Sequence, residues 1–356
     1  MTKSHPNRRG FLLNAASVAL AGTAVLGCRK ASESTASVKS ENDFRSHGSS
    51  ELVTVTDFRG VNLNLKKPAQ RVICLLESAL SGLYMLGAQD RLVGVPANVY
   101  SGDIAPHYAM LDPRLANKGI ETPGNWDFMS LEKVIALKPD VVILWAQQRE
   151  GIAALEARGI PVYGVFIDSL KDLEKEINDF AFLTGTENRA KVLLEYTQVE
   201  VQSITALTAN IPAENRPRIY FAWGQGMLET ACKGSIIDDL IHLAGGINTC
   251  IEQIEHGKPS LESVLKWNPD VIVLWPSERR SAASVLADEQ WRNVSAIRNR
   301  RVFELPEVFY SDLWTLKYQY VLHLMAHWFH PAIVSKPSDA NMHADVISKL
   351  YGLKQL

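Results

Sequence analysis

Aromatic, amide and charged side chains gather directly after segments that the sequence predicts to be β-strands. In parallel sheets, ligands bind beyond the carboxyl ends of the strands, so these side chains are candidates for a binding site. Tryptophan and tyrosine supply apolar area, and arginine pairs with carboxylate or catecholate oxygens, which suits a bulky, flat or anionic chelate. The candidates are Glu77, Ser78, Asn98, Tyr100, Trp126, Gln147 and Arg149 in the first half, and Trp223, Gln225, Arg279, Arg280, Tyr310 and Trp314 in the second.

Among the cations, Arg149 is the first choice for a ligand contact because it lies only four residues beyond Trp145. Arg279 and Arg280 occupy the equivalent place after Trp275. The two tryptophans themselves end predicted strands, and we interpret them as packing residues.

A direct metal site is a weaker interpretation of the sequence. His323 and His327 have the spacing of neighbours on one helical face, with His330 close behind. Their apolar neighbours, however, are typical of a packed terminal helix. Apart from His107, the predicted loops after the strands, where the ligand is expected, carry almost no histidine. This favours capture of a chelate over capture of a bare metal ion.

Catalytic signatures are missing from the sequence. It contains no GxSxG, HExxH or Walker A motif, and the short run 224–226 is too small a glycine signal for a dinucleotide site. The formal net charge of -2 gives no electrostatic reason to expect nucleic acid. We therefore expect a binding protein, with no cofactor and no enzymatic activity.

An internal repeat sets the architecture that must position these residues. Residues 130–145 and 260–275 are identical at nine of 16 positions, at an offset of 130 residues. That offset exceeds the period of about 20 to 50 residues typical of solenoids, so it indicates two similar lobes. Each copy predicts a helix capped by Ser130 or Ser260, a stop at Pro139 or Pro269, and an apolar strand at 141–145 or 271–275.

The flanks of the repeat add further strands and helices. Strands are expected at 71–75 and 160–166 in the first lobe, and at 218–222 and 301–305 in the second. Helices after the opening strands are expected to end near Gly87 and near Gly245. The fold class is therefore α/β, with two Rossmann-like lobes that contain parallel sheets.

A single long helix is expected to join the lobes. Residues 187–209 have apolar positions at helical spacing, and Thr186 is in place to cap them. A helix of that length spans roughly 35 Å and forms a stiff hinge, which favours modest closure. The expected boundaries are 51–185 for the N-terminal lobe, 186–212 for the connecting helix, 213–335 for the C-terminal lobe and 336–356 for a C-terminal extension.

The N-terminus predicts export and lipid anchoring. Residues 1–27 have the architecture of a signal peptide, with Arg8 and Arg9 in a stretch that resembles the twin-arginine export motif. Residues 25–28 resemble a lipobox, which makes Cys28 the expected lipidation site. The serine-rich segment 28–50 is expected to be a flexible tether on the extracytoplasmic side of a bacterial membrane.

Three further cysteines, Cys74, Cys232 and Cys250, form no CxxC pair. A structural zinc site is therefore not expected. An oxidising compartment permits a disulfide between Cys232 and Cys250, but buried apolar thiols are an equally good interpretation.

Together, these features resemble the binding-protein family that feeds iron-siderophores, haem and cobalamin to ABC importers. The resemblance covers roughly residues 52–331, including an opening at 53–60 that looks like the family's β-hairpin and the closing pair 330–331. It implies a monomer that captures a metal chelate between its lobes and delivers it to a permease dimer with a cytoplasmic ATPase. By position in the repeat, Glu132 and Glu262 would dock against the permease, although an acid in a first helical turn also offsets the helix dipole without any partner.

Within that resemblance, an iron-siderophore is the commonest cargo, and haem and cobalamin are further candidates. A molybdate or tungstate receptor and a ligand-sensing surface lipoprotein are the alternatives, and a metal-dependent enzyme is the least favoured. The resemblance alone does not name the ligand.

Overall fold

The structure is a computed structural model that describes residues 52–277 and 279–353. The predicted signal peptide, Arg8, Arg9, Cys28 and the tether at 28–50 lie outside this range. Across the described residues, no helix is both long enough and apolar enough to cross a membrane.

The described part opens with the expected hairpin. Strand β1 (Val53–Thr56) pairs antiparallel with β2 (Asn62–Leu65). Asp57 fixes the turn, because its Oδ1 accepts hydrogen bonds from the backbone N–H groups of Arg59 (2.9 Å) and Val61 (3.0 Å).

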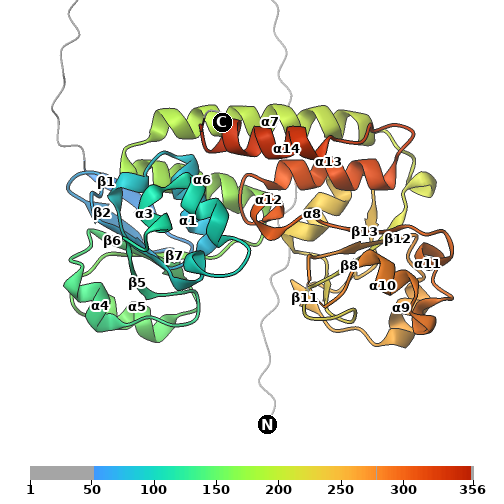
Figure 1. Ribbon diagram of the computed structural model, residues 1–356, viewed down its shortest axis with the longest axis horizontal. Helices are drawn as coiled ribbons and strands as arrows, with labels where there is room; N and C mark the ends of the chain where they lie inside the picture. The colour runs from blue at the N-terminus through green and yellow to red at the C-terminus, as the bar shows by residue number, and fades with distance from the viewer. Residues whose placement is uncertain (1–51, 278, 354–356) are drawn as a thin grey trace, which may run out of the picture. The chain divides into compact units, whose positions relative to one another are not determined.

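Five parallel strands form the sheet of the N-terminal lobe, in the order β5-β4-β3-β6-β7. Their bounds are β3 Val72–Cys74, β4 Leu92–Pro96, β5 Glu121–Gly124, β6 Val141–Trp145 and β7 Val162–Val165. The helices of this lobe are α1 Glu77–Met85, α2 Ala105–Leu111, α3 Pro113–Ala116, α4 Leu131–Ala136, α5 Arg149–Glu156 and α6 Leu170–Thr184 (Figure 1).

A four-stranded parallel sheet, in the order β10-β8-β12-β13, forms the C-terminal lobe. Its strands are β8 Arg218–Ala222, β10 Ile247–Asn248, β12 Val271–Leu274 and β13 Val302–Glu304, beside a small pair of β9 Thr230–Ala231 and β11 His256–Gly257. Its helices include α8 Ile236–Leu243, α9 Leu261–Trp267, α10 Ala282–Leu286 and α11 Ser295–Arg298. All six strands predicted from the sequence are present, within two residues of the expected ends.

Both faces of each central strand are buried, as the apolar runs predicted. Along β6, Val141 and Ile143 face the main core, whereas Val142 and Leu144 face a cluster under α4 and α5. The same alternation holds along β12, where Ile272 and Leu274 face a cluster under α9, α10 and α11. Side chains alternate between the two faces of a strand. In each lobe, one face of the sheet therefore packs against a core of that lobe alone, and the other face packs against the main core that both lobes share.

Helix α7 (Glu187–Thr208) connects the two lobes, as predicted. The predicted cap is wrong in detail: Thr186 precedes the helix, but its side chain makes no capping bond and instead lies 3.0 Å from the hydroxyl of Thr184. The caps at Ser130 and Ser260 are confirmed, since each hydroxyl accepts a hydrogen bond from the backbone N–H three residues later.

The C-terminal segment returns to the N-terminal lobe. After α12 (Val308–Ser311) and α13 (Tyr318–Phe329), the chain forms α14 (Asp339–Asp345) and a π-helical turn at Val346–Leu350. The hydroxyl groups of Tyr351 and Ser81 lie 2.7 Å apart, and Arg189 on α7 donates to the Lys349 and Leu350 carbonyls at 2.8 Å. The stretch predicted as an extension therefore adds a second tie between the lobes.

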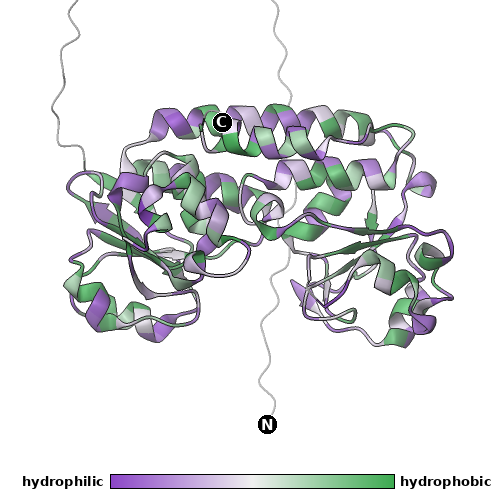
Figure 2. Cartoon of the chain, viewed as in Figure 1, coloured by the Kyte–Doolittle hydropathy of each residue, from purple (hydrophilic) through white to green (hydrophobic). Residues whose placement is uncertain are grey.

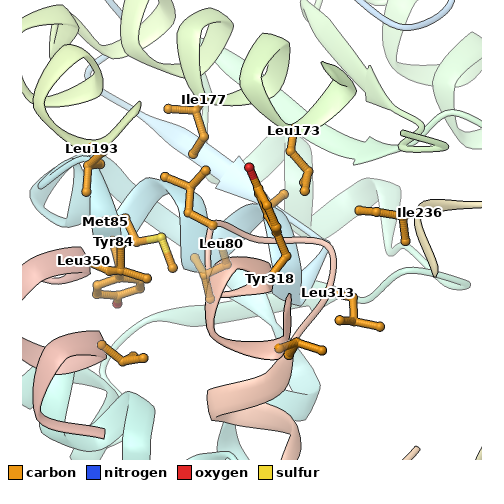
Figure 3. Close-up of a cluster of buried hydrophobic side chains, with 14 of the residues drawn as sticks. Leu80, Tyr84, Met85, Leu173, Ile177, Leu193, Ile236, Leu313, Tyr318 and Leu350 are labelled. Atoms are coloured by element: carbon orange, nitrogen blue, oxygen red, sulfur yellow. The ribbon is translucent and has the colours of Figure 1, made fainter. Parts of the chain in front are cut away.

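One hydrophobic core runs through both lobes. Figure 3 shows side chains from α1, α6, α7, α8 and α13 in one buried cluster, to which the fully buried Leu350 also belongs. Apolar stretches of these helices also stand out in the hydropathy colouring of Figure 2. Because the shared core joins the lobes, a change in their relative orientation has to repack it.

The three histidines considered as a metal cluster, His323, His327 and His330, are structural in this arrangement. Each of them hydrogen-bonds a backbone carbonyl, at 3.2, 2.8 and 3.0 Å. The segment around them forms α13 (Tyr318–Phe329), in agreement with the interpretation as a packed terminal helix.

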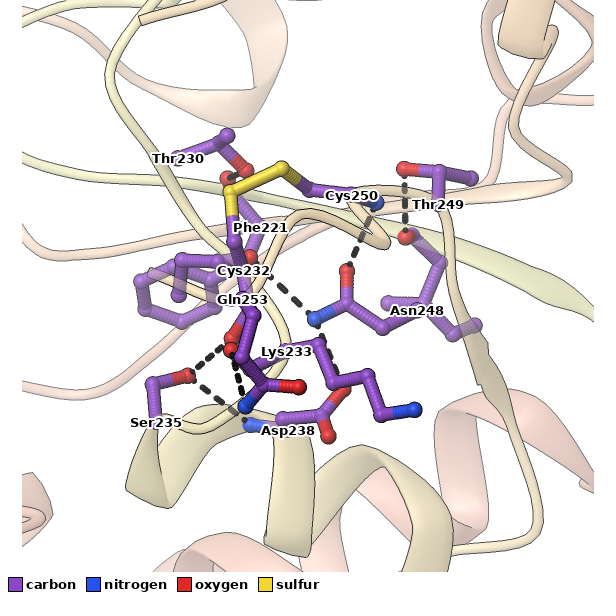
Figure 4. Close-up of a disulfide and its surroundings, with 12 residues drawn as sticks. Phe221, Thr230, Cys232, Lys233, Ser235, Asp238, Asn248, Thr249, Cys250 and Gln253 are labelled. Carbon is purple, nitrogen blue, oxygen red and sulfur yellow. Dashed lines mark hydrogen bonds between the residues drawn. A yellow bond between two sulfur atoms is a disulfide. The ribbon is translucent and has the colours of Figure 1, made fainter. Parts of the chain in front are cut away.

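Cys232 and Cys250 form a disulfide, which settles the alternative that the sequence left open (Figure 4). Asn248 supports the loop that carries it, accepting from the Cys250 N–H at 3.1 Å and donating to Asp238 at 3.0 Å. Cys74 is free and buried, and burial raises the pKa of its thiol.

Removing this disulfide is expected to destabilise the fold. A cross-link between residues 18 positions apart restricts the unfolded chain, so replacing both cysteines with serine should lower the free energy of unfolding by about 2 to 4 kcal/mol. Urea unfolding of the variant, beside the native protein with and without reductant, measures the effect. A Cys74→Ser variant tests whether the buried free thiol contributes independently.

Candidate ligand-binding cleft

A cavity of about 610 Å³ lies between the lobes, at the carboxyl ends of both sheets. It is lined by side chains that follow β3, β4, β5, β6 and β7 of one lobe and β8, β12 and β13 of the other. The lining residues are Leu76, Glu77, Ser78, Asn98, Trp126, Trp145, Val165, Phe166, Ile167, Gln225, Glu255, Trp275, Val308, Asp312 and Trp314. This is the position at which parallel α/β sheets bind ligands.

Six of the thirteen predicted ligand contacts line this cavity. They are Glu77, Ser78, Asn98, Trp126, Gln225 and Trp314. Five of them lie two to four residues after a strand, as the sequence predicted, whereas Trp314 lies ten residues after β13.

Gln147 and Arg149 lie beside the cavity rather than in its wall. They line two neighbouring hollows of about 470 and 500 Å³, the second of which shares Trp126 and Trp145 with the central cavity. Arg149 is the first residue of α5 and is exposed. The cation favoured from the sequence is therefore at the mouth of the cleft.

Four of the other predicted residues pack behind the wall, and the fifth is exposed. The Tyr100 hydroxyl donates to the Ile120 carbonyl at 2.8 Å, and Tyr310 stacks on His343 at 3.7 Å. Arg280 donates to the Trp223 carbonyl at 2.6 Å, which holds Trp223 in place. Trp223 itself, 7% exposed, supports the wall, and Arg279 is exposed to solvent.

Trp145 and Trp275 line the cavity, so their prediction as packing residues was wrong. Trp145 contacts Trp126 edge to face at 5.7 Å, and Trp275 lies 5.8 Å from Trp314. Trp223 backs the second pair at 5.5 and 5.7 Å. Two tryptophan pairs, one on each lobe, thus form the aromatic walls of the cleft.

A buried polar cluster forms the floor of the cavity. Glu77 accepts a hydrogen bond of 2.5 Å from the Tyr108 hydroxyl. Asp312 accepts from the Trp314 N–H at 3.0 Å through Oδ1, while its buried Oδ2 has no hydrogen-bond partner among the described residues. Behind them, fully buried Lys317 donates to the Phe309 carbonyl at 2.7 Å.

Burial controls the ionisation of this floor. The pKa of Asp312 is raised to about 7, mainly by loss of water; the Lys317 ammonium opposes this shift and the nearby Glu77 carboxylate contributes to it. Burial raises the pKa of Glu176, beneath Asp312, to about 8. The floor therefore changes charge near neutral pH.

Glu255 was missing from the candidates drawn from the sequence. Asp312 lies inside the stretch 310–314 that the sequence placed at the cleft, but only Tyr310 and Trp314 were selected from that stretch. Glu255 reaches the rim from the loop before β11, whose short pairing with β9 has no strong sequence signal.

The repeated glutamates are exposed at matching positions. Glu132 lies in the first turn of α4, and Glu262 lies in the first turn of α9. In the view of Figure 1, both helices lie at the edge of their lobe that is farthest from α7. Neither carboxylate makes a side-chain hydrogen bond or an ion pair within the described part of the chain, so both are available to a partner.

Two α/β lobes with a ligand-sized cavity between the ends of their sheets define a solute-binding protein. Residues 72–309 match the periplasmic binding protein family, and since this range is more than half of the sequence, the chain belongs to that family. Its function is accordingly binding, and not catalysis.

Three characterised relatives bind three different cargoes. Molybdate-binding protein MolA of Haemophilus influenzae is 27% identical over 78% of this chain and 84% of its own length, and its molybdate-bound structure matches with a TM-score of 0.71 at 22% identity, covering 85% of this chain and 99% of that one. The iron(3+)-hydroxamate-binding protein FhuD of Bacillus subtilis is 28% identical over 72% of this chain and 81% of its length. A vitamin B12-binding protein of Vibrio parahaemolyticus is 23% identical over 67% and 82%.

Proposed function

We propose that this protein is a lipid-anchored receptor that captures a metal chelate in the cleft between its lobes and delivers it to an ABC importer. The observation that carries the proposal is the cavity of about 610 Å³ with a tryptophan pair on each wall. Flat aromatic surfaces suit a large ligand with apolar faces, and a cavity of this size is in the range of drug-sized molecules.

A bare oxyanion is the second candidate, because MolA is among the relatives. Sites for small oxyanions are built from arginine side chains and clustered backbone N–H groups. Among the described residues, no arginine, lysine or histidine lines the central cavity, and Arg149 lies in a neighbouring hollow. The lining therefore favours an iron-siderophore or a corrinoid over molybdate or tungstate.

Delivery rests on the repeat and on the N-terminus. The lobes carry Glu132 and Glu262 on equivalent exposed helix starts, an arrangement that suits a permease built from two similar subunits. Lipidation at Cys28 would hold the receptor near that permease. A sensing lipoprotein that passes its ligand to a signalling partner remains the competing role.

The cargo is tested by purifying the protein from its own organism and recording native mass spectra and visible absorbance. A chelate is expected to add a mass of several hundred daltons or more together with a metal isotope pattern. Recovery with molybdate alone would replace the chelate with the oxyanion.

The wall is tested with the recovered ligand. Replacing Trp314 with alanine should weaken binding about 10- to 100-fold, because it removes a large contact surface from the cavity. Trp328→Ala is the matched control, because Trp328 stacks on Phe303 at 5.1 Å and is not among the residues that line the cavity. Equal affinities of the two variants for the ligand would show that the ligand does not bind in this cleft.

A further inference from the structure

The charged groups in the cleft are predominantly acidic. Three carboxylates, those of Glu77, Asp312 and Glu255, line the central cavity, and within the described part of the chain no cationic side chain does. Fully buried Lys317 is the cation behind the floor, directed toward the Phe309 carbonyl and the face of the Phe309 ring, 4.6 Å from the ring centroid. When the carboxylates are ionised, one ammonium does not balance them.

The aromatic lining acts in the same direction as the carboxylates. Tryptophan has the ring face that attracts cations best, and Trp126, Trp145, Trp275 and Trp314 all line this cavity. Aromatic walls with nearby carboxylates are how proteins bind ammonium groups. An anionic ligand would instead approach like charges in a partly desolvated space.

Asp312 is the group that gains most from a cation. It is 3% exposed, and its Oδ2 is buried without a hydrogen-bond partner among the described residues. A buried carboxylate oxygen without a donor is costly, and a donor that carries positive charge compensates it best. The Trp314 backbone N–H donates to Oδ1 and thereby holds this carboxylate beside the tryptophan wall.

We propose that the cleft selects ligands that carry positive charge, either cationic metal complexes or chelates with a pendant ammonium or guanidinium group. The inference rests on the proposed capture of a metal chelate and adds the charge class of that chelate. Glu77, Asp312 and Glu255 supply the counter-charge, and the four tryptophans provide the ring faces.

The pH dependence of binding follows from the groups around Asp312. Glu77 on α1 and Glu176 on α6 face it as acids, Tyr108 on α2 contributes a hydroxyl, and Lys317 supplies the opposing ammonium. A bound cation favours the ionised carboxylate, so affinity for a cationic ligand should rise from pH 6 to pH 8, across the raised pKa of Asp312.

The test uses three ferric complexes of similar size with the full chain, followed by quenching of tryptophan fluorescence. The complexes are those of a linear trihydroxamate with a free terminal amine, of the same trihydroxamate with that amine acetylated, and of an anionic tris-catecholate. The amine complex should bind at least about 10-fold more tightly than its acetylated counterpart at pH 8. Equal binding of these two, or preference for the tris-catecholate, would overturn the proposal.

A charge-neutralising variant links the preference to the named residues. The double variant Glu77→Gln, Glu255→Gln should lower the affinity ratio of the two trihydroxamates at least about threefold, with Asp312 left as the remaining carboxylate. Glu252→Gln, in the same loop as Glu255 but outside the cavity lining, should leave the ratio unchanged. Asp312→Asn is avoided as the sole test because it leaves Lys317 buried with one acid fewer. Should the double variant misfold, Glu255→Gln alone, at the exposed rim, should still halve the ratio or more.

The failure of the inference is distinguishable from the failure of the proposed function. If the protein binds chelates irrespective of their charge, the inference is wrong, but the proposed capture of a chelate is still supported. If none of the three complexes binds, the net charge of the chelate recovered with the native protein decides: a cationic group supports the inference, and an anionic chelate overturns it. Recovery of a bare oxyanion overturns both.

Discussion

Cells that carry the double variant Glu132→Ala, Glu262→Ala are expected to lose at least about nine tenths of ligand uptake, while the purified variant keeps its ligand affinity. Both carboxylates are exposed in first helical turns, and neither contacts the cavity. Removing charges at the rim of an interface slows association and weakens docking without changing a distant site. Uptake of radiolabelled ligand and binding by the purified protein measure the two halves of this result.

The control is a second pair of exposed glutamates. Glu187 and Glu195 lie on α7, at the opposite edge from α4 and α9 in Figure 1, so Glu187→Ala, Glu195→Ala should leave uptake at the native level. Each single docking variant should give an intermediate loss, because either lobe then still engages the partner. Native uptake by the double docking variant would reduce the two glutamates to acids that offset the helix dipole, worth about 0.3 to 1 kcal/mol each.

Truncation after Ser338 is expected to leave the protein unable to fold stably. It removes Met342, Val346, Leu350 and Tyr351, all buried in the shared core. Losing one large buried side chain costs about 2 to 5 kcal/mol, so the combined loss is comparable with the whole stability of about 5 to 15 kcal/mol of a typical protein. Circular dichroism and a thermal melt of the truncated protein measure the outcome.

A graded form of this prediction uses single substitutions. Leu350→Ala should lower the free energy of unfolding by about 2 to 5 kcal/mol. Its neighbour Lys349 is exposed and contributes only its backbone carbonyl to Arg189, so Lys349→Ala should change stability by no more than about 0.5 kcal/mol. A cooperative, native-like melt of the truncated protein would show that the segment is an accessory.

The two lobes could be predicted because the sequences of their central strands have a clear pattern. The runs at 141–145 and 271–274 are apolar at every position, which fits burial on both faces, and their duplication fixed the two-lobe arrangement. Serine caps and proline stops are local signals, so Ser130 and Ser260 were found. Thr186 shows the limit of such signals, because its hydroxyl has an equally good partner in Thr184.

The sequence predicted which residues lie near the cleft, but not whether their side chains face it. Distance from a strand end places a residue near the cavity, and Glu77, Asn98 and Trp314 reach it as expected. Whether a side chain then faces the cavity depends on tertiary partners: Tyr310 turns toward His343, and Arg280 turns toward the Trp223 carbonyl. Those contacts have no signature in the local sequence.

The C-terminal segment differs most from its prediction, because it packs into the shared core rather than forming an extension. Its role depends on contacts such as Tyr351 with Ser81, separated by 270 residues, which composition and periodicity do not reveal. A polar stretch at 335–339 separates it from α13 and favours the interpretation as an extension.

That long-range contact also sets an order in time. Ser81 leaves the ribosome 270 residues before Tyr351, which at about 5 to 20 residues per second is an interval of roughly 15 to 50 s. Throughout it, the N-terminal lobe lacks the C-terminal side chains, among them Leu350 and Tyr351, that belong to the same core cluster as Leu80 and Met85. The nascent lobe therefore presents an unfinished apolar surface during synthesis, and a holding chaperone is the factor on which production of this protein should depend.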